Sequence, residues 1–374
     1  MASKKTRRKV KKIAKKHPVL VVIAILLIVA IVGCCVLHKK GVIHIPFLDK
    51  VFPPEENQES IITDDLQIHF LELGNKAPGD CTLIKIGDTE VLIDAGSERS
   101  SAQTIVPYIQ TYCTDGVLEY VIATHADTDH IAAFVGTSSI QGVFESFECQ
   151  TIIDFPKTTK DTQMYKDYVA MRDQEVAKGA KHYTALQCWN NEGDAKRSYQ
   201  LAEEITLNIL YQKFYEEDTS VENNNSVCML LTQGNNHYLF TGDLEKAGEQ
   251  SLVKNNTLPK CKLYKAGHHG SDTSSTVELL QKIQPEIVVA NCCCGGKYNF
   301  PHQEFIDNVA VYTDKVYIPV LVAENEEGYA LLNGNIIVRS NGGEVQVQCS
   351  NNNTLLKDTP WFAENRKRPK EWAE

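Results

Sequence analysis

The chain has 374 residues, and 43% of them are apolar, which is enough to build one large domain or two small ones. Its formal net charge is −10, but residues 1–18 hold nine Lys or Arg and no acid, so the remainder carries 29 basic against 48 acidic side chains. This acidic bulk argues against broad nucleic-acid binding, which normally needs a basic surface.

A basic tail (residues 1–18) and an apolar segment (residues 19–38) open the chain. The uncharged run Val19–Leu37 would span about 28 Å as a helix, close to the hydrocarbon thickness of a bilayer. Because positive charge stays in the cytoplasm, we predict a single-pass anchor in the cell membrane, with the N-terminus cytoplasmic and the following domain extracellular. Ile31–Cys34 also resembles a bacterial lipoprotein-processing site, so a lipid anchor on Cys34 is the lesser alternative.

The rest of the chain is predicted to form a linker, one folded domain and a tail. Residues 39–62 contain three prolines and an acidic run, a composition typical of an exposed spacer. Residues 63–350 show alternating strand and helix patterns without an internal repeat, and the polar residues 351–374 are predicted to form a surface tail. The twelve cysteines show no zinc-ribbon spacing, and they are many for an exported protein.

Apolar periodicity and turn residues predict the elements of the domain in chain order. Strands are expected over residues 66–73, 81–86, 90–93, 119–123, 152–153, 205–211, 226–232, 237–240 and 286–290. Helices are expected over residues 104–112, 131–135, 161–178 and 274–283. Hairpin turns are expected at Gly87–Asp88, Gly234–Asn235 and Asn333–Gly334. This order predicts an α+β protein in which two sheets are sandwiched between helices, a four-layer αβ/βα arrangement.

Four metal-competent side chains fall within six residues, directly after the apolar strand 119–123. They are His125, Asp127, Asp129 and His130. Imidazole and carboxylate are common ligands of zinc, manganese and iron. A strand that ends in such a cluster presents its ligands on the loop at its carboxyl end, so the segment predicts a metal site.

Further candidate ligands follow two later strands. Asp243 ends the run Tyr238–Asp243, and His268 and His269 follow the apolar stretch that starts at Leu263. Alone, Asp243 would be read as a turn residue and the two histidines as a loop pair. Because all three clusters follow predicted strands, they are expected to converge at one edge of a sheet.

Taken as a set, these motifs resemble those of the metallo-β-lactamase-fold hydrolases and, within them, the hydrolase domain of ComEC-type competence proteins. The resemblance covers roughly residues 66–340 and extends to Asn225–Ser226, Lys265–Ser271 and Pro301–His302. Two departures are Ala132–Ala133, where the family usually has two glycines, and the extra residues 75–78. The membrane-channel segments of the full competence proteins are not seen around this domain.

The resemblance implies two divalent metal ions, zinc or manganese. The first would be held by His125 and Asp127, with Asn225 standing where many relatives have a third histidine. The second would be held by Asp129, His130 and one of His268 or His269, and Asp243 would bridge both ions. The oxygen-rich first position shifts the preference somewhat toward manganese.

The implied reaction is hydrolysis by a metal-bound hydroxide, with Asp129 in the catalytic group. Lys265 is a candidate to neutralise a phosphate oxygen in the transition state, although a plain strand-end lysine fits its position as well. His302 is a candidate donor to the leaving group or a wall of the cleft, and a surface histidine is the alternative. Asp80 and Asp94 are expected to orient loops and ligands rather than to bind metal.

Three classes of function compete. The preferred one is a membrane-tethered, metal-dependent phosphodiesterase with a phosphate-ester substrate, a nuclease acting on DNA being one form of it. The second is an extracytoplasmic hydrolase of another class, acting on a lactone, a lactam or the phosphocholine of a wall polymer. The third is a non-catalytic binding module, which the intact ligand set disfavours. The predicted partners are the bilayer, through residues 19–38, and the substrate; no protein partner can be inferred.

Overall fold

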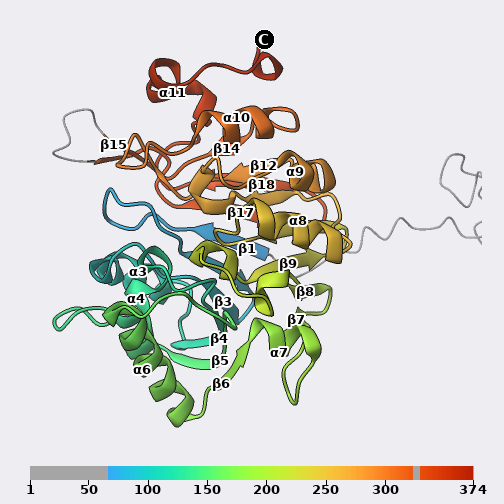
Figure 1. The fold of residues 1–374 in the computed structure, drawn as a ribbon. Helices are drawn as coiled ribbons and strands as arrows, with labels where there is room; N and C mark the ends of the chain where they lie inside the picture. Colours follow the sequence, from blue (N-terminus) through green and yellow to red (C-terminus); the bar gives the residue numbers. More distant parts are fainter. Residues whose placement is uncertain (1–65, 323–328, 374) are drawn as a thin grey trace, which may run out of the picture. The chain divides into compact units, whose positions relative to one another are not determined.

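The structure, a computed structural model, describes residues 66–322 and 329–373 (Figure 1). The predicted basic tail, membrane anchor and linker therefore lie outside the described residues. Among the helices that the structure describes, none combines the length and the apolar character needed to span a bilayer.

Two large sheets and one small sheet organise the described chain. The first has the order β18 (Val345–Cys349), β17 (Ile336–Ser340), β1 (Leu66–Phe70), β2 (Thr82–Ile86), β3 (Thr89–Ile93), β4 (Val117–Ile122), β5 (Glu148–Asp154) and β6 (Lys181–Thr184). The second has the order β14 (Val316–Tyr317), β12 (Ile287–Val289), β11 (Leu263–Lys265), β10 (Asn236–Phe240), β9 (Cys228–Gln233), β8 (Ile205–Leu210) and β7 (Ser198–Ala202). The small sheet contains β13 (Cys293–Cys294), β15 (Val320–Val322) and β16 (Tyr329–Leu331).

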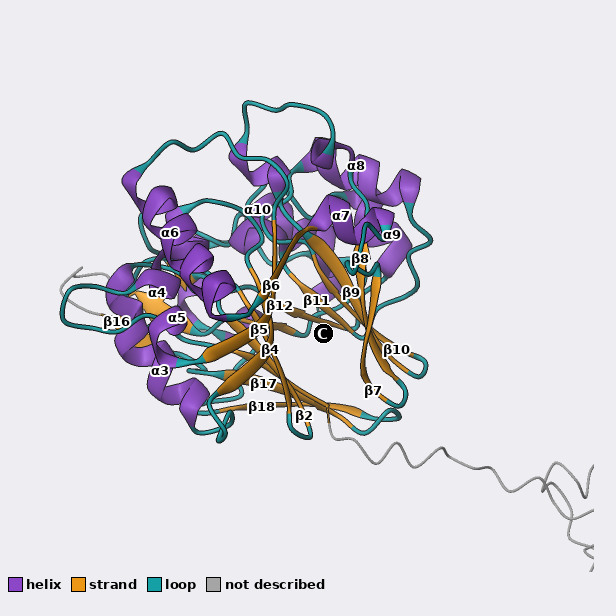
Figure 2. Cartoon of the chain, turned by 90° about the horizontal axis from the view of Figure 1, so that it is seen from below, coloured by secondary structure: helices purple, strands orange, loops and turns teal. Residues whose placement is uncertain are grey.

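Helices cover the outer faces of both large sheets, which gives the predicted four-layer α/β sandwich. Figure 2 shows the strands between two groups of helices. One group contains α3 (Ala102–Gln110), α4 (Thr128–Val135), α5 (Val143–Ser146) and α6 (Gln163–Lys178). The other contains α8 (Lys246–Asn255), α9 (Val277–Ile283) and α10 (Gln303–Ala310), while α7 (Ala185–Asn190) follows β6.

Two hydrophobic cores explain why the sandwich forms. Along β9, Met229 and Leu231 belong to the core between the sheets, while Cys228 and Leu230 belong to the core under the outer helices. Successive side chains of a strand point to opposite faces, so an unbroken apolar strand can be buried on both sides. This is why β9 and its neighbours read as continuous apolar runs in the sequence.

Parallel strands place the loops that matter for function. Strands β3, β4 and β5 are parallel to one another in the first sheet, and β10, β11 and β12 are parallel in the second. The carboxyl ends of β3, β4, β10 and β11 lead into the segments that begin at Asp94, Ala123, Thr241 and Ala266. The strand-end placement that the sequence predicts is therefore confirmed.

The two-residue turns at Gly87–Asp88 and Gly234–Asn235 are confirmed as hairpins, because Ile86 pairs with Thr89 and Gln233 pairs with Asn236. The predicted hairpin at Asn333–Gly334 is wrong. Here the chain passes from β16 in the small sheet to β17 in the first sheet, and these strands do not pair. The buried Asn333 amide donates instead to the carbonyls of Ile318 and Thr354, so it serves as a tie between segments.

The segment after residue 350 also differs from the predicted surface tail. It forms the helix α11 (Pro360–Asn365) and packs against the outer core of the second sheet. Trp361, Phe362 and Trp372 are buried there, at 7%, 1% and 3% exposure. The segment is polar on average, but it contains a few widely spaced aromatic residues. The free energy gained by burying these side chains outweighs the entropy lost when the chain becomes ordered.

Candidate metal centre

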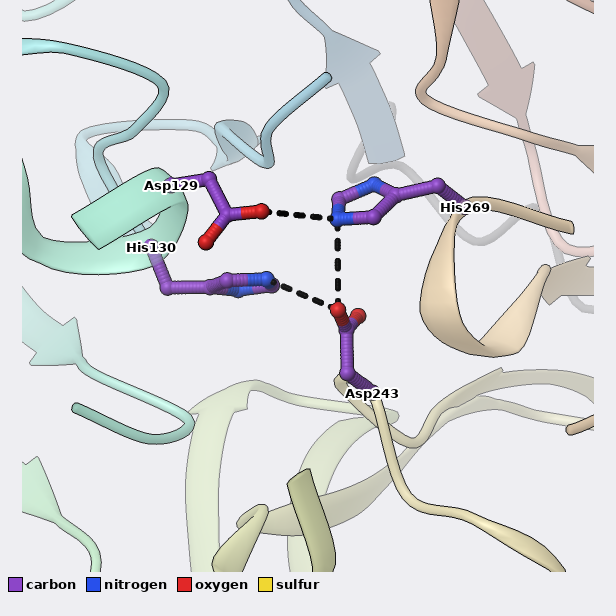
Figure 3. Close-up of side chains that lie close together, drawn as sticks. All are labelled: Asp129, His130, Asp243 and His269. Atoms are coloured by element: carbon purple, nitrogen blue, oxygen red, sulfur yellow. Dashed lines mark ion pairs between the residues drawn. The ribbon is translucent and has the colours of Figure 1, made fainter. Parts of the chain in front are cut away.

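The loops after β4, β10 and β11 bring four predicted ligands together at one edge of the sandwich. Asp129 and His130 lie in the first turn of α4, Asp243 follows β10 and His269 follows β11. One ligand atom from each of these residues lies within 4.8 Å of all the others. Figure 3 shows the four side chains converging on a common centre from different elements.

Asp243 is the hub of this group of four. Its Oδ2 atom lies 3.2 Å from Nε2 of His130 and 3.2 Å from Nε2 of His269 (Figure 3). The Oδ2 atom of Asp129 lies 3.5 Å from the same His269 nitrogen. Two imidazoles and two carboxylates form a donor set suited to zinc or manganese.

The histidine tautomers fit a metal. His269 donates from Nδ1 to the carbonyl oxygen of Asn291 at 2.8 Å, and His130 donates from Nδ1 to the Asp94 carboxylate at 2.8 Å. The opposite Nε2 atoms of both rings, and that of His125, are buried without a hydrogen-bond partner among the described residues. Buried polar atoms are rarely left unsatisfied, and ligating histidines usually donate their other N–H in this way. The four residues therefore fit a divalent ion.

The structure distinguishes the two neighbouring histidines that the sequence left open. His269 is 1% exposed and points its Nε2 atom at the group of four. His268 Nε2 is 4.0 Å from Asp243 Oδ2, and its Nδ1 atom lies 2.9 Å from the Thr273 hydroxyl. Of the two, only His269 belongs to the group of four candidate ligands, while His268 is a lining residue of the neighbouring cleft.

The structure gathers fewer of the predicted ligands at the first metal position than at the second. His125 Nε2 lies 3.5 Å from Asp127 Oδ2, so these two donors face each other as expected. Asn225, the third predicted ligand, donates its side-chain amide to the Glu222 carboxylate at 3.2 Å. The structure thus brings His125 and Asp127 together, and it holds Asn225 through its amide nitrogen, while a metal would bind the side-chain oxygen.

Lys265 and His302 do not lie where a substrate contact would need them. The Lys265 ammonium is buried, ion-paired with Asp80, and 3.6 Å from Oδ1 of Asp243. His302 accepts at Nδ1 from the Asp272 backbone N–H and donates at Nε2 to the Tyr298 carbonyl. The buried Lys265 ammonium thus lies close to the Asp243 carboxylate. Both ring nitrogens of His302 form hydrogen bonds with the chain's own backbone.

A cleft with a volume of about 220 Å³ opens onto three of the four residues, Asp129, Asp243 and His269. Within the described residues it is lined by Pro78, Asp127, Asp129, Asn223, Asp243, His268, His269, Tyr298 and Phe300. Lys265 and His302 are absent from this lining. Pro78 belongs to the extra residues 75–78, so this departure from the family's pattern contributes to one wall of the cleft.

The electrostatics of the group favour a cation. Burial alone would raise the pKa of Asp243, but His269, His130 and Lys265 outweigh it and hold that pKa well below its usual range. Burial alone would lower the pKa of His130, but Asp243 and Asp94 outweigh it and raise that pKa well above its usual value. The carboxylates thus attract a proton to the imidazole when no metal is present, and the same field favours a divalent ion.

Sequence reasoning missed two residues beside the site, Glu222 and Lys160. Glu222 is 5% exposed and accepts hydrogen bonds from the backbone of Ala126 and from Thr158 and Thr159. Lys160 pairs with Asp127 at 2.5 Å. Neither belongs to a recognisable motif, and each becomes visible only when distant loops are brought together by the fold.

Comparison with known proteins supports the fold and the motif. Residues 74–137, which include His125 to His130, match the model of the metallo-beta-lactamase superfamily. Recombination protein 2 of Haemophilus influenzae is 26% identical over 79% of this chain, and ComE operon protein 3 of Bacillus subtilis is 27% identical over 50%. The competence protein ComA of Neisseria gonorrhoeae is 25% identical over 64%.

The chain spans only part of these relatives, namely 31%, 22% and 29% of their respective lengths. Among solved structures, the metallo-beta-lactamase fold protein YhfI of Bacillus subtilis is similar, with 12% identity, a TM-score of 0.42, and coverage of 74% of this chain and 100% of the other. Residues 74–137 thus match the metallo-beta-lactamase superfamily, and the chain is similar in sequence to part of several competence-related proteins.

Proposed function

We propose that the chain is a metal-dependent phosphodiesterase whose reaction takes place in the cleft beside Asp129, His130, Asp243 and His269. The observation that supports this most directly is the convergence of these side chains, with the Nε2 atoms of both histidines buried and without a hydrogen-bond partner among the described residues. Zinc and manganese both suit this donor set, and the aspartate at the first position favours manganese.

When bound, divalent ions lower the pKa of a coordinated water and polarise the scissile bond. The protein's part is to hold the donors rigidly. Asp94 fixes the His130 ring and the Asn291 carbonyl fixes the His269 ring. Lys265 and Asp80 hold Asp243 from the buried side. Preorganised groups of this kind do not have to reorient during the reaction.

Phosphate esters are favoured over lactams by the oxygen-rich donors and by the position of Lys160. This lysine pairs with Asp127 and its side chain is 31% exposed, so its ammonium can reach an anionic group in the cleft. Lys160 does not itself line the cleft, but its partner Asp127 does, and on this ground Lys160 replaces Lys265 as the proposed cation for a phosphate oxygen. The acidic composition of the domain favours a small or locally charged substrate over long duplex DNA, and single-stranded nucleic acid remains within the proposal.

We also propose, from the sequence pattern alone, that residues 19–38 anchor the chain in the cell membrane with the catalytic domain outside. The nine basic residues before this segment and its lack of charge support the orientation. The competence-related proteins are matched only in part, so their whole-protein activities are not transferred to this chain.

The test is a substrate panel on the purified full chain, stripped of metal and then supplied with manganese or zinc. The panel contains bis-p-nitrophenyl phosphate, a chromogenic lactam, a lactone and p-nitrophenyl phosphorylcholine. We expect turnover of the phosphodiester, lost in Asp129→Asn and kept in Asp173→Asn, which changes an exposed carboxylate on α6. Turnover of only the lactam, the lactone or the phosphocholine ester would replace the proposed substrate class with that one.

A further inference from the structure

The first metal position carries an ion pair that the sequence motif does not predict. The Lys160 ammonium lies 2.5 Å from Oδ1 of Asp127, while Oδ2 of the same carboxylate lies 3.5 Å from His125 Nε2. One oxygen of Asp127 therefore faces a predicted metal ligand, and the other is already paired with a cation of the protein.

The placement of Lys160 is built into the fold by Glu222. This buried carboxylate accepts from the Ala126 backbone at 3.0 Å, from the Thr158 hydroxyl at 3.0 Å, and from the Thr159 backbone and hydroxyl at 2.5 and 2.8 Å. It thereby joins the residue before Asp127 to the two residues before Lys160. A buried carboxylate with several donors is costly to disrupt, so the two loops are held together.

The same carboxylate also engages Asn225, whose side-chain amide donates to it at 3.2 Å. At the first position His125 and Asp127 face each other, and the contact of Asn225 with Glu222 uses its amide nitrogen rather than the oxygen that could bind a metal. The second position has its four donors gathered within 4.8 Å of one another. At the first position a lysine of the protein pairs directly with one of the donors, at 2.5 Å, whereas the Lys265 ammonium lies 3.6 Å from the nearest oxygen of Asp243.

We propose that Lys160 competes with a divalent ion for Asp127, so that the first position binds its ion more weakly than the second and exchanges it. The orphaned Nε2 atom of His125 keeps this position able to bind metal. The inference rests on the proposed function only in taking both positions as metal sites. Removing the ammonium leaves Asp127 free to bind, and binding to the second position does not involve Lys160.

The test is equilibrium dialysis of the metal-stripped full chain against buffered manganese, with metal per chain measured by mass spectrometry and no substrate present. Wild type should bind two ions whose dissociation constants differ at least about tenfold. Loss of a supporting group at a metal site typically changes the affinity by this amount. Lys160→Met should tighten the weaker step about fivefold, the upper range for a partly exposed ion pair, and leave the tighter step unchanged. Asp127→Asn should remove the weaker step alone.

Lys157→Met is the matched control, because this nearby lysine pairs with Asp218 and the Glu216 carbonyl rather than with Asp127. Its binding curve should match wild type. Two ions of equal affinity, or a weaker step that Lys160→Met leaves unchanged or loosens, would overturn the inference. Failure of the proposed function has another signature, namely no metal bound by wild type, or binding that Asp129→Asn leaves intact.

Discussion

Asp94 and His130 form a hydrogen bond of 2.8 Å between a carboxylate oxygen and Nδ1, which fixes the histidine ring across two strand ends. The same carboxylate accepts from the backbone N–H and the hydroxyl of Thr124 at 2.7 and 2.8 Å. The loop after β3 thus sets the orientation of a ligand that follows β4. Because Nδ1 donates to Asp94, the Nε2 atom of His130 is directed at Asp243.

Replacing Asp94 should weaken metal binding without removing a ligand. In Asp94→Ala the His130 ring loses its acceptor, so we expect affinity at the second position to fall about 10- to 100-fold, the usual effect of losing such a partner. Dialysis against buffered manganese measures this, and circular dichroism checks that the fold is kept. A folded variant with wild-type affinity would contradict the orienting role of Asp94.

The two adjacent histidines should behave differently. His269→Ala removes a buried ligand, so the second ion and at least about 100-fold of the metal-dependent turnover should be lost. His268→Ala alters only the cleft wall, so the metal content should stay at the wild-type value while the KM changes. Metal analysis and steady-state kinetics on both variants decide this. The reverse pattern would assign the ligand to His268.

Lys265 should matter for stability more than for substrate binding. Lys265→Met leaves the buried carboxylates of Asp80 and Asp243 without their cation, so the metal-free chain should lose about 3–5 kcal/mol in its free energy of unfolding. Adding Asp80→Asn should restore part of this loss, because one buried charge is removed as well. Urea unfolding measures both variants. An unchanged stability together with a raised KM would instead return Lys265 to the substrate-binding role first expected.

Glu249 on α8 should make stability depend on pH. Burial raises its pKa from 4.5 to about 7, although the backbone N–H groups of Ser275 and Thr276 partly oppose the shift. Between these two values the folded chain binds more protons than the unfolded chain, so this contribution to stability is full below about pH 4.5 and is lost as the pH rises to about 7.

The size of this effect follows from the shift in pKa and is at most roughly 3 kcal/mol. Urea unfolding at about pH 5 and pH 8 measures it. In Glu249→Gln the difference between the two conditions should shrink by this amount, since the replacement cannot ionise. An equal pH dependence in wild type and variant would show that Glu249 is not the group responsible.

The sequence predicted the site better than it predicted the connections around it. Strand-end ligands such as Asp129 and Asp243 are readable because each follows an apolar run, and parallel strands bring their carboxyl ends to one edge. The hairpin predicted at Asn333–Gly334 is wrong because a turn dipeptide does not specify which sheet the next strand joins. The ion pair of Lys160 with Asp127 could not be predicted from the sequence, because it depends on Glu222, which is distant from both residues in the chain.

The most direct test of the account is turnover of bis-p-nitrophenyl phosphate by the full chain while manganese is restored to the metal-stripped protein. We predict that activity rises with the bound metal measured in the same samples, and that Asp243→Asn abolishes both metal binding and turnover. Turnover that is unchanged in the stripped protein, or a folded protein that binds metal and hydrolyses no phosphodiester, would contradict a metal-dependent phosphodiesterase.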